Sequence, residues 1–282
     1  MAKPTKSKYE NARAWIKIYN QLRGLVLNQF EWEGLEKYNI PEEWLETLLY
    51  ENGRCTVFLD PDNGILCLPS TDGPQRNTYN YPLHYIVTGN SYHRTVNAAE
   101  SVLIRNNKTE HPTDAVVRYY ADRLYEIQRT MDTNVKQQKF PFVFSVDANN
   151  LLTFKAIFDK IDDNEVAIYA DKNLDLENAV GCVQTGAPFI LDKMADYMHD
   201  TFNNFLTEIG FNNANTDKRE RLVTDEVNSN NEVITAYMNV RLSEREKACH
   251  LMKSVLGMDV SVKRRETAPG NVMIGGATDV SE

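Results

Sequence analysis

Two long stretches of the chain carry apolar residues at steps of three and four, the spacing that gathers them on one face of an α-helix. The first covers residues 113–138, with Thr113 as its N-cap, and the second covers 188–209, beginning at Pro188 and ending before Gly210. At about 1.5 Å per residue, the helices would be roughly 39 Å and roughly 33 Å long. The apolar positions of the first are Val116, Val117, Tyr120, Leu124, Ile127, Met131 and Val135. Those of the second are Ile190, Leu191, Met194, Tyr197, Met198, Phe202, Phe205, Leu206 and Ile209.

The segment between the two helices, residues 139–187, has the pattern of a small α+β unit. FPFVFSV is predicted to be a strand, DANN a turn and KAIFDKI a short helix, and EVAIYA and VGCVQT are two further strands. Two long helices that bracket a compact insert are the main organisational feature of the sequence.

The N-terminal part begins with helices and continues with strands. Residues 11–33 have a helical apolar pattern, and Pro41 starts a shorter helix that ends at Gly53. From 54 to 110 the chain alternates short β-type runs with turns, among them DPDNG between two predicted strands. DPDNG resembles part of a calcium loop, but its glycine comes one position early and no glutamate closes the loop. A hairpin turn is therefore the better interpretation.

The C-terminal part begins with a polar stretch after the second long helix. Residues 228–239 are predicted to form a mobile loop, because the polar stretch around them has little apolar content. Ser243 and Glu246 have the spacing of a capping box for a helix that ends at Gly257, and the strand MDVSVKR follows. The tail, residues 266–282, is expected to be disordered. Together these elements predict the α+β fold class.

The charge of the chain argues against a protein that grips nucleic acid over much of its surface. The net charge is -9 and the pI is about 5.2. The first 17 residues differ, because five basic side chains stand against one acidic one. This arm has two interpretations, a contact to phosphate or an ordinary solvated tail. The candidate contacts are Lys3, Lys6 and Lys8.

The sequence lacks the common signatures of metal sites, membrane spans and several enzyme classes. Its four cysteines are scattered, without a C-x-x-C pair or a histidine at ligand spacing, which predicts reduced thiols, no metal and no cofactor. No apolar run reaches about 18 residues, so we expect a protein that stays in the cytoplasm of the cell that makes it. No P-loop, Rossmann, G-x-S-x-G or H-E-x-x-H motif occurs, and adjacent carboxylates such as Asp162 and Asp163 do not converge on one substrate atom. No catalytic residue is therefore assigned.

Five sequence blocks carry a resemblance to a known family. The most specific is DKRERLVTDEVNSNNEVI at 217–234. The others are QFEWEGL at 29–35, DANNLLTFK at 147–155, GAPFILDK at 186–193 and SEREKACHLMKSVLGMDVSVK at 243–263. In this order they resemble the upper collar protein (connector, or portal) of Picovirinae-type short-tailed phages, whose linear genomes are protein-primed. The resemblance covers residues 11–265.

The resemblance implies a phage portal fold, in which twelve subunits form a ring around a DNA channel. The helices 113–138 and 188–210 would form the stem around the channel, and residues 139–187 would form the clip at its narrow end. Residues 1–112 and 211–265 would build the wider, mixed wing region.

Two groups of residues are candidates for contact with DNA. One is the polar face of the second stem helix, where twelve copies of a repeated carboxylate would keep DNA centred; an ordinary solvated helix face is the alternative. Its residues are Asp192, Lys193, Asp196, Asp200, Asn203 and Asn204. The other is the tunnel loop that the resemblance places near 226–241, either a valve against back-slippage or a plain solvent loop. Its residues are Asn228, Ser229, Asn230, Asn231 and Glu232.

Lys193 matches the lysine of the family's GAPFILDK block. It would be a sparse phosphate contact, unless it only forms a surface ion pair. A second basic position would be expected one to two turns later, but Met198, His199 and Asp200 stand there. The sequence therefore does not support a second ring of lysines.

The resemblance also implies partners and a location at the capsid vertex of the virion. The partners are further copies of the chain, double-stranded DNA, the major capsid protein, the packaging ATPase and lower collar or tail proteins. A packaging RNA contacts the N-terminal arm of some members, but the arm here is short and only moderately basic. Two other classes stay open as alternatives: a phage enzyme such as a nuclease or hydrolase, and a tail-collar adaptor module.

Overall fold

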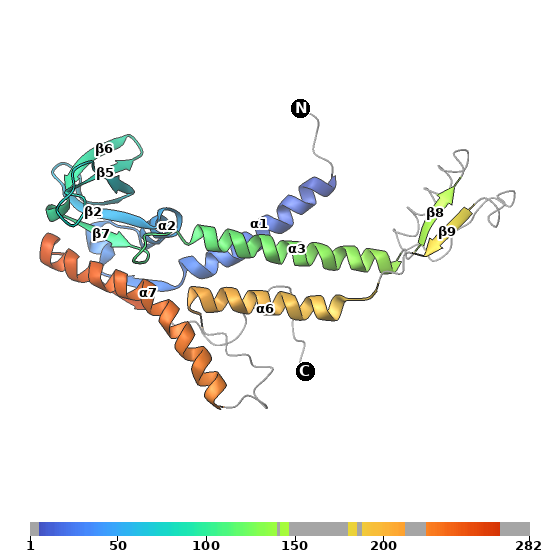
Figure 1. The fold of residues 1–282 in the computed structure, drawn as a ribbon. Helices are drawn as coiled ribbons and strands as arrows, with labels where there is room; N and C mark the ends of the chain where they lie inside the picture. The colour runs from blue at the N-terminus through green and yellow to red at the C-terminus, as the bar shows by residue number, and fades with distance from the viewer. Residues whose placement is uncertain (1–5, 140–141, 147–179, 185–187, 212–223, 266–282) are drawn as a thin grey trace. The chain divides into compact units, whose positions relative to one another are not determined.

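The computed structural model describes residues 6–139, 142–146, 180–184, 188–211 and 224–265 (Figure 1). The helices are α1 (Lys6–Leu27), α2 (Glu42–Asn52), α3 (Asp114–Lys139), α6 (Leu191–Ile209) and α7 (Thr224–Leu256), with 3₁₀ turns at Leu35–Tyr38 and Ala98–Glu100. The strands are β1 (Phe30–Glu33), β2 (Arg54–Asp60), β3 (Gly64–Leu68), β4 (Ser70–Asp72), β5 (His84–Gly89), β6 (Tyr92–Asn97), β7 (Ser101–Arg105), β8 (Phe142–Val146), β9 (Val180–Gln184) and β10 (Ser261–Arg264). The chain divides into two compact units, a larger one of Met1–Glu126 with Met198–Glu282 and a smaller one of Ile127–Tyr197.

Small antiparallel sheets form the β part of the larger unit. β2 lies between β3 and β7, and β5 lies between β4 and β6. β1 pairs with β10, so a strand near the start of the chain shares a sheet with the last strand of the described part. Antiparallel pairing throughout these sheets fits the predicted α+β class.

Two hydrophobic clusters form most of the core of the larger unit. The first packs α2 and α7 against β2 and β7 (Figure 1). Its fully buried members include Leu45, Leu49, Val57, Ile104 and Met252. The second packs α1 against the first half of α3 and the second half of α6. Its fully buried members include Leu22, Val117, Leu124, Phe205 and Ile209.

A hydrogen-bond network fixes the start of α3 beside α1 and α2. The carboxylate of Asp114 accepts hydrogen bonds from the hydroxyls of Tyr19 (2.6 Å) and Tyr50 (3.0 Å) and from Nε of Arg118 (2.6 Å). Burial, followed by the hydrogen bond with Tyr19, raises the pKa of Tyr50. Because a carboxylate in the first turn also faces the positive end of the helix dipole, Asp114 stabilises this helix start.

The smaller unit contains the end of α3, the antiparallel β8–β9 pair and the start of α6. The side chain of Asn134 on α3 is buried and reaches the residues just before α6. Its Nδ2 donates to the carbonyl of Pro188 (2.9 Å), and its Oδ1 accepts from the backbone N–H of Ile190 (3.3 Å). The second bond satisfies a backbone group that has no partner inside a helix, so Asn134 fixes where α6 begins.

The structure confirms most of the predicted elements. The two long helices, α2 with its C-cap Gly53, and strands β2, β3 and β10 lie where the sequence predicted them. DPDNG forms a hairpin turn in which Oδ1 of Asp60 accepts from the backbone N–H groups of Asp62 and Asn63. The elements predicted between 147 and 179, the tail from 266 and arm residues 1–5 lie outside the described residues.

Two predictions of secondary structure are wrong, and the first concerns residues 11–33. The helix α1 ends at Leu27, and residues from Phe30 form β1. Phe30 and Trp32 are buried, and their strand pairs with β10. The helical apolar spacing was misleading here because pairing with a distant strand and burial of two aromatic side chains outweigh local preference.

The second wrong prediction is the mobile loop at 228–239, which lies within the span 226–241 that the resemblance assigns to a tunnel loop. The helix α7 is continuous from Thr224 to Leu256, so Ser243 and Glu246 lie in its interior and do not form a capping box. The hydroxyl of Ser243 donates instead to the carbonyl of Val240 (3.5 Å). The second half of α7 is anchored by buried Met252 and its neighbours, and extending an anchored helix avoids the cost of nucleation. A polar segment can therefore be helical here.

The described residues contain neither a metal-binding cluster nor a membrane-spanning helix. No group of three or more His, Cys, Asp or Glu side chains in the described ranges is arranged to hold a metal ion. None of the described helices combines the length and apolar content that crossing a membrane requires. Cys55, Cys67 and Cys249 are buried, and none of the three forms a disulfide bond.

Asp60 links the β2–β3 turn to β6, and this link predicts a dependence of stability on pH. The carboxylate is nearly buried and accepts hydrogen bonds from the Tyr92 hydroxyl (2.5 Å) and from Nη1 of Arg94 (2.7 Å). The Tyr92 bond above all lowers the pKa of Asp60 below its usual value of 3.8. A lowered pKa in the folded state gives stability that is present above pH 4 or so and is lost as the pH falls below it.

We therefore expect the substitution Asp60→Asn to lower the melting temperature at neutral pH, with a difference from the wild type that shrinks towards pH 3. Thermal unfolding measured between pH 3 and pH 7 checks this expectation. A difference that stays constant across the range would contradict it. Asp62→Asn, at an exposed position in the same turn, is the control and should change little.

Candidate functional site

Helix α6 separates apolar from polar side chains along its length. Its buried residues are Thr201, Phe202, Phe205, Leu206 and Ile209. Its exposed polar residues include Asp192, Lys193, Asp196, Asp200 and Asn204. Asn203 is partly buried, and its Nδ2 lies 3.1 Å from Nδ1 of His199. The structure therefore brings the predicted polar positions of this helix to its solvent-facing side.

Asp192, Asp196 and Asp200 form an acidic ridge on α6. They repeat every four residues, which separates neighbours by about 6 Å along the helix axis. Within the described part of the chain, none of the three carboxylates forms a salt bridge, and neither does Lys193. The alternative in which Lys193 only serves a surface ion pair is therefore not observed among these residues. Among the described residues, the ridge therefore presents negative charge to solvent without a paired cation.

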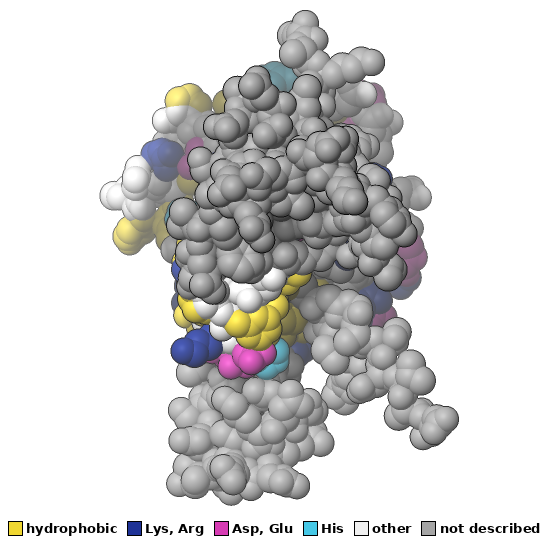
Figure 2. All heavy atoms as spheres, turned by 90° about the vertical axis from the view of Figure 1, so that its right-hand side faces the viewer, with side chains coloured by type: hydrophobic (Ala, Val, Ile, Leu, Met, Phe, Trp, Pro, Cys, Tyr) yellow, Lys and Arg dark blue, Asp and Glu magenta, His cyan; other side chains and the backbone are white. Residues whose placement is uncertain are grey.

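The apolar stripe of α6 is only partly covered by the chain itself. Tyr197 is 45% exposed, and Phe189, just before the helix, is 60% exposed. On the face shown in Figure 2, acidic side chains at the described surface lie next to hydrophobic ones. Exposed aromatic area of this kind is typical of a surface that a partner covers.

The second half of α6 is held against α3 within the larger unit. The hydroxyl of Tyr120 donates to Oε2 of Glu208 (2.8 Å), and its ring lies 5.4 Å from that of Phe205. Burial, and next this hydrogen bond, raise the pKa of Tyr120, so its hydroxyl stays protonated as a donor at neutral pH. These contacts keep the buried face of α6 inward and leave the polar face outward.

The other predicted site residues lie in α7, in α1 or outside the described residues. Asn228, Ser229, Asn230, Asn231 and Glu232 lie in the first half of α7 and not in a loop. Lys6 and Lys8 lie in the first turns of α1, and Lys3 lies outside the described residues. A contact between any of these residues and DNA stays a prediction.

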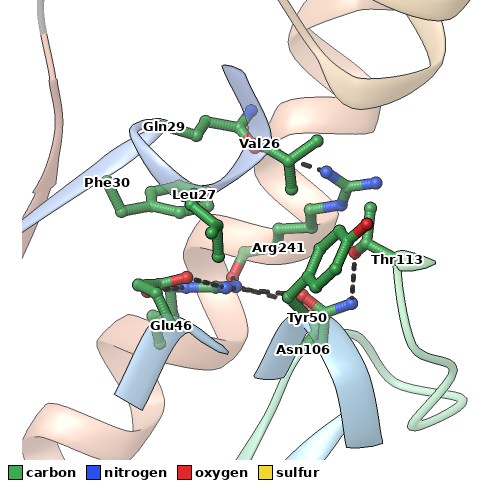
Figure 3. Close-up of a pocket in the computed structure, with 10 residues that line it drawn as sticks. Val26, Leu27, Gln29, Phe30, Glu46, Tyr50, Asn106, Thr113 and Arg241 are labelled. Carbon is green, nitrogen blue, oxygen red and sulfur yellow. Dashed lines mark hydrogen bonds and ion pairs between the residues drawn. The ribbon is translucent and has the colours of Figure 1, made fainter. Parts of the chain in front are cut away.

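A buried polar site that the sequence analysis missed joins α2, α7 and β1 (Figure 3). Nε and Nη2 of Arg245 donate to the two carboxylate oxygens of Glu46 (2.9 and 2.7 Å), and both side chains are at most 5% exposed. Nε1 of Trp32 donates to the same carboxylate (2.7 Å), and the guanidinium of Arg245 lies 4.2 Å from the centre of the Phe30 ring. This ion pair connects segments that are far apart in the sequence.

One weak sequence signal could have pointed to this buried site. Arg241 and Arg245 are four residues apart, so they share a face of α7 with the buried Ala248 and Met252. Their acidic partner Glu46 lies 199 positions away from Arg245. No spacing rule relates residues so distant, so only the folded chain identifies the pair.

The fold of the chain is similar to that of phage portal proteins. The chain is similar to a chain in the structure of the portal and tail of native bacteriophage P68, with 14% identity and a TM-score of 0.51 over 95% of this chain and 93% of that chain. It is also similar to an HK97 family phage portal protein from Corynebacterium diphtheriae, with 10% identity and a TM-score of 0.46 over 94% and 96% of the two chains. At such identities the first of these likenesses shows the α+β fold.

The family is shown by the sequence itself. Residues 3–268 match the family model described as Phage Connector (GP10), and the chain belongs to this family. It is a portal, or head–tail connector, protein of the phage virion, located at the capsid vertex. The expected portal class is confirmed, and neither the enzyme nor the adaptor alternative is favoured.

Proposed function

We propose that subunits of this chain close into a ring and that the polar face of α6 lines the channel through which double-stranded DNA enters and leaves the capsid. The observation that carries the proposal is the acidic ridge. Its three carboxylates are exposed on the face opposite Phe202, Phe205 and Leu206, and no described cation neutralises them. By the resemblance the ring would contain twelve copies.

The physical reason for an acidic channel is that DNA must pass without being held. A packaging channel transmits every sequence, so base readout has no use there. Each phosphate that a cation neutralises releases counterions and adds affinity, so a channel rich in Lys and Arg would act as a brake. Rings of carboxylates repel the phosphates and keep the duplex near the axis. Lys193 would then be the sparse phosphate contact.

Charge reversal of the ridge tests this assignment. The triple variant Asp192→Lys, Asp196→Lys and Asp200→Lys should raise the affinity of the purified ring for double-stranded DNA by about tenfold or more at low salt. It should also make binding steeply salt-dependent and slow the release of packaged DNA. Binding measured over a series of salt concentrations gives both the affinity and the slope.

A matched control separates the channel from general surface charge. The triple Glu43→Lys, Asp62→Lys and Glu100→Lys changes the net charge by the same amount at exposed positions outside α6. This control should leave the affinity for DNA much closer to that of the wild type. Equal gains in affinity for both triples would contradict a channel-lining role for α6.

The finer assignments rest on the resemblance of the sequence blocks. We propose that the protein comes from a Picovirinae-type phage, that it acts without catalysis, and that it docks the major capsid protein, the packaging ATPase and the lower collar or tail. A packaging RNA is the least supported partner. Negative-stain imaging of the purified protein should show rings with a central hole, and protein that stays monomeric under all assembly conditions would end the ring proposal.

A further inference from the structure

Two buried cysteines on neighbouring strands of the larger unit are in contact. Cys55 lies on β2 and Cys67 on β3, and Sγ of Cys67 donates a hydrogen bond to Sγ of Cys55 at 3.6 Å. Val57, two residues after Cys55, is the cross-strand partner of Cys67, so the two cysteines are diagonal neighbours on one face of the sheet. Both belong to the core cluster that packs α2 and α7 against this sheet. The fold thus holds a pair of thiols together in its core.

The two thiols of this pair differ in their surroundings. Cys55 is fully buried, and the hydrogen bond from Cys67, followed by burial, raises the pKa of its thiol well above the usual value. Glu46 and Arg245 also act on Cys55, the carboxylate raising and the guanidinium lowering this pKa. Cys67 is 5% exposed and lies on β3, an outer strand of its sheet. Because cysteine oxidation depends on exposure, a small oxidant reaches Cys67 first.

A small movement separates this contact from a disulfide bond. The sulfur atoms of a disulfide lie about 2.0 Å apart, so the pair has to approach by roughly 1.5 Å. Within its sheet β3 pairs only with β2, so rotation of the two side chains and a small shift of this outer strand can supply the approach. The two cysteines are 12 positions apart, and the β2–β3 turn keeps their strands in register.

A portal protein meets two redox environments. The chain belongs to the connector family and is located at the capsid vertex of the virion. Proteins of a virion are made in the cytoplasm, where thiols are kept reduced, and disulfides form and persist at the oxidising virion surface. The conditions that act on the two thiols therefore change after assembly.

We propose that Cys55 and Cys67 form a site of oxidative cross-linking, reduced while the protein is made and joined by a disulfide bond in the released particle. The oxidant is a small hydroperoxide. The Cys67 thiolate attacks its outer oxygen, the O–O bond breaks, and the other oxygen leaves as an alcohol or as water. The sulfur of Cys55 then attacks the sulfenic acid on Cys67, so the S–S bond forms as the S–O bond breaks. The hydroxyl group leaves with the proton of the Cys55 thiol as water, and the peroxide has taken up the two electrons that the thiols lost.

Peptide mapping of the purified full-length protein tests the cross-link. The protein is treated with hydrogen peroxide, its remaining thiols are alkylated, and the chain is cleaved before Asp60 and Asp62, which lie between the two cysteines. The peptides that contain Cys55 and Cys67 should stay joined and separate on reduction. Because the two sulfurs already touch, this link should exceed any other cysteine link at least about tenfold. Thiols that all remain open to alkylation, or links without preference, would overturn the proposal.

Single substitutions test the order of the two steps. In Cys55→Ala the oxidation should stop at the sulfenic acid of Cys67, which dimedone labels, whereas Cys67→Ala should leave the fully buried Cys55 unlabelled. Equal labelling of the two variants would overturn this order. Cys249→Ala, which removes another buried thiol of the same cluster, is the control and should keep the link. Loss of the link in this control would overturn direct pairing. The mapping of the unaltered protein stands even where a variant fails to fold.

Hydrogen exchange tests what the cross-link does to the fold. The amides of β3 should exchange at least about tenfold more slowly in the oxidised protein than in the reduced one, because the bond ties the outer strand to β2. Reduction should restore the faster rate. Equal exchange in the two states would overturn a role of the bond in fixing β3.

A comparison of two sources tests the change on release. Portal protein from released particles should contain the linked peptides, and portal protein from infected cells lysed in an alkylating reagent should contain the two thiols separately alkylated. The same state in both sources would overturn the proposed change. These outcomes do not depend on whether α6 lines the channel.

Discussion

Replacing Arg245 with methionine is expected to lower the free energy of unfolding by about 3–5 kcal/mol, the usual cost of leaving one partner of a buried ion pair uncompensated. The partner, Glu46, is 5% exposed and would retain only the Trp32 hydrogen bond among the donors described for its carboxylate. Since a folded domain is stable by only about 5–15 kcal/mol, this single change should remove a large part of the stability. Urea denaturation of the purified protein measures it.

A surface ion pair at the C-terminal end of α7 is the control for this prediction. Lys253 and Asp259 lie 3.1 Å apart with both side chains more than 70% exposed, so Lys253→Met should destabilise the protein far less than Arg245→Met. The double variant Glu46→Gln and Arg245→Met should be more stable than Arg245→Met alone, because it removes the stranded charge. If Lys253→Met and Arg245→Met were equally destabilising, the burial of the Glu46–Arg245 pair would not be the cause.

Gly53→Ala is expected to have the other large effect on stability. Gly53 is the C-cap of α2 with φ +76°, and a Cβ there would overlap the carbonyl oxygen of Glu110 and lie 2.7 Å from its carbonyl carbon. The backbone conformation alone costs a non-glycine residue about 1–2 kcal/mol. The overlap with a backbone atom, which cannot rotate away, should add to this cost and shift the segment before α3. Thermal unfolding and circular dichroism measure the loss.

Gly64 offers a control with the same backbone angle. Its φ is also +76°, but a Cβ at that position would have no atom within 4 Å. Gly64→Ala should therefore show the conformational cost alone, about 1–2 kcal/mol, and Gly53→Ala should clearly exceed it. Similar losses for the two variants would mean that the approach of Glu110 to Gly53 does not limit this turn.

Some residues of the candidate site could be predicted from the local sequence pattern, and others depend on tertiary contacts. The acidic ridge was predictable because Asp192, Asp196 and Asp200 repeat with the helical period opposite an apolar stripe, and helical periodicity decides which side chains face solvent. The buried Glu46–Arg245 pair was not predictable, because burial of a charge depends on a partner that local sequence does not contain. The burial of Arg241 was not predictable for the same reason.

The sequence by itself determined the two long helices, the short helix α2, the β2–β3 hairpin and the portal class of the protein. Each of these depends on information within a few turns of chain, such as apolar periodicity, turn residues or a sequence block of known resemblance. What the tertiary structure alone decided was where α1 ends and that α7 runs unbroken from Thr224 to Leu256. Residues 30–33 become a strand because β10, more than 220 positions later, offers hydrogen bonds to their backbone. The polar first half of α7 continues as a helix because its second half is already held in the core, so the cost of nucleation is met by the buried second half of the same helix.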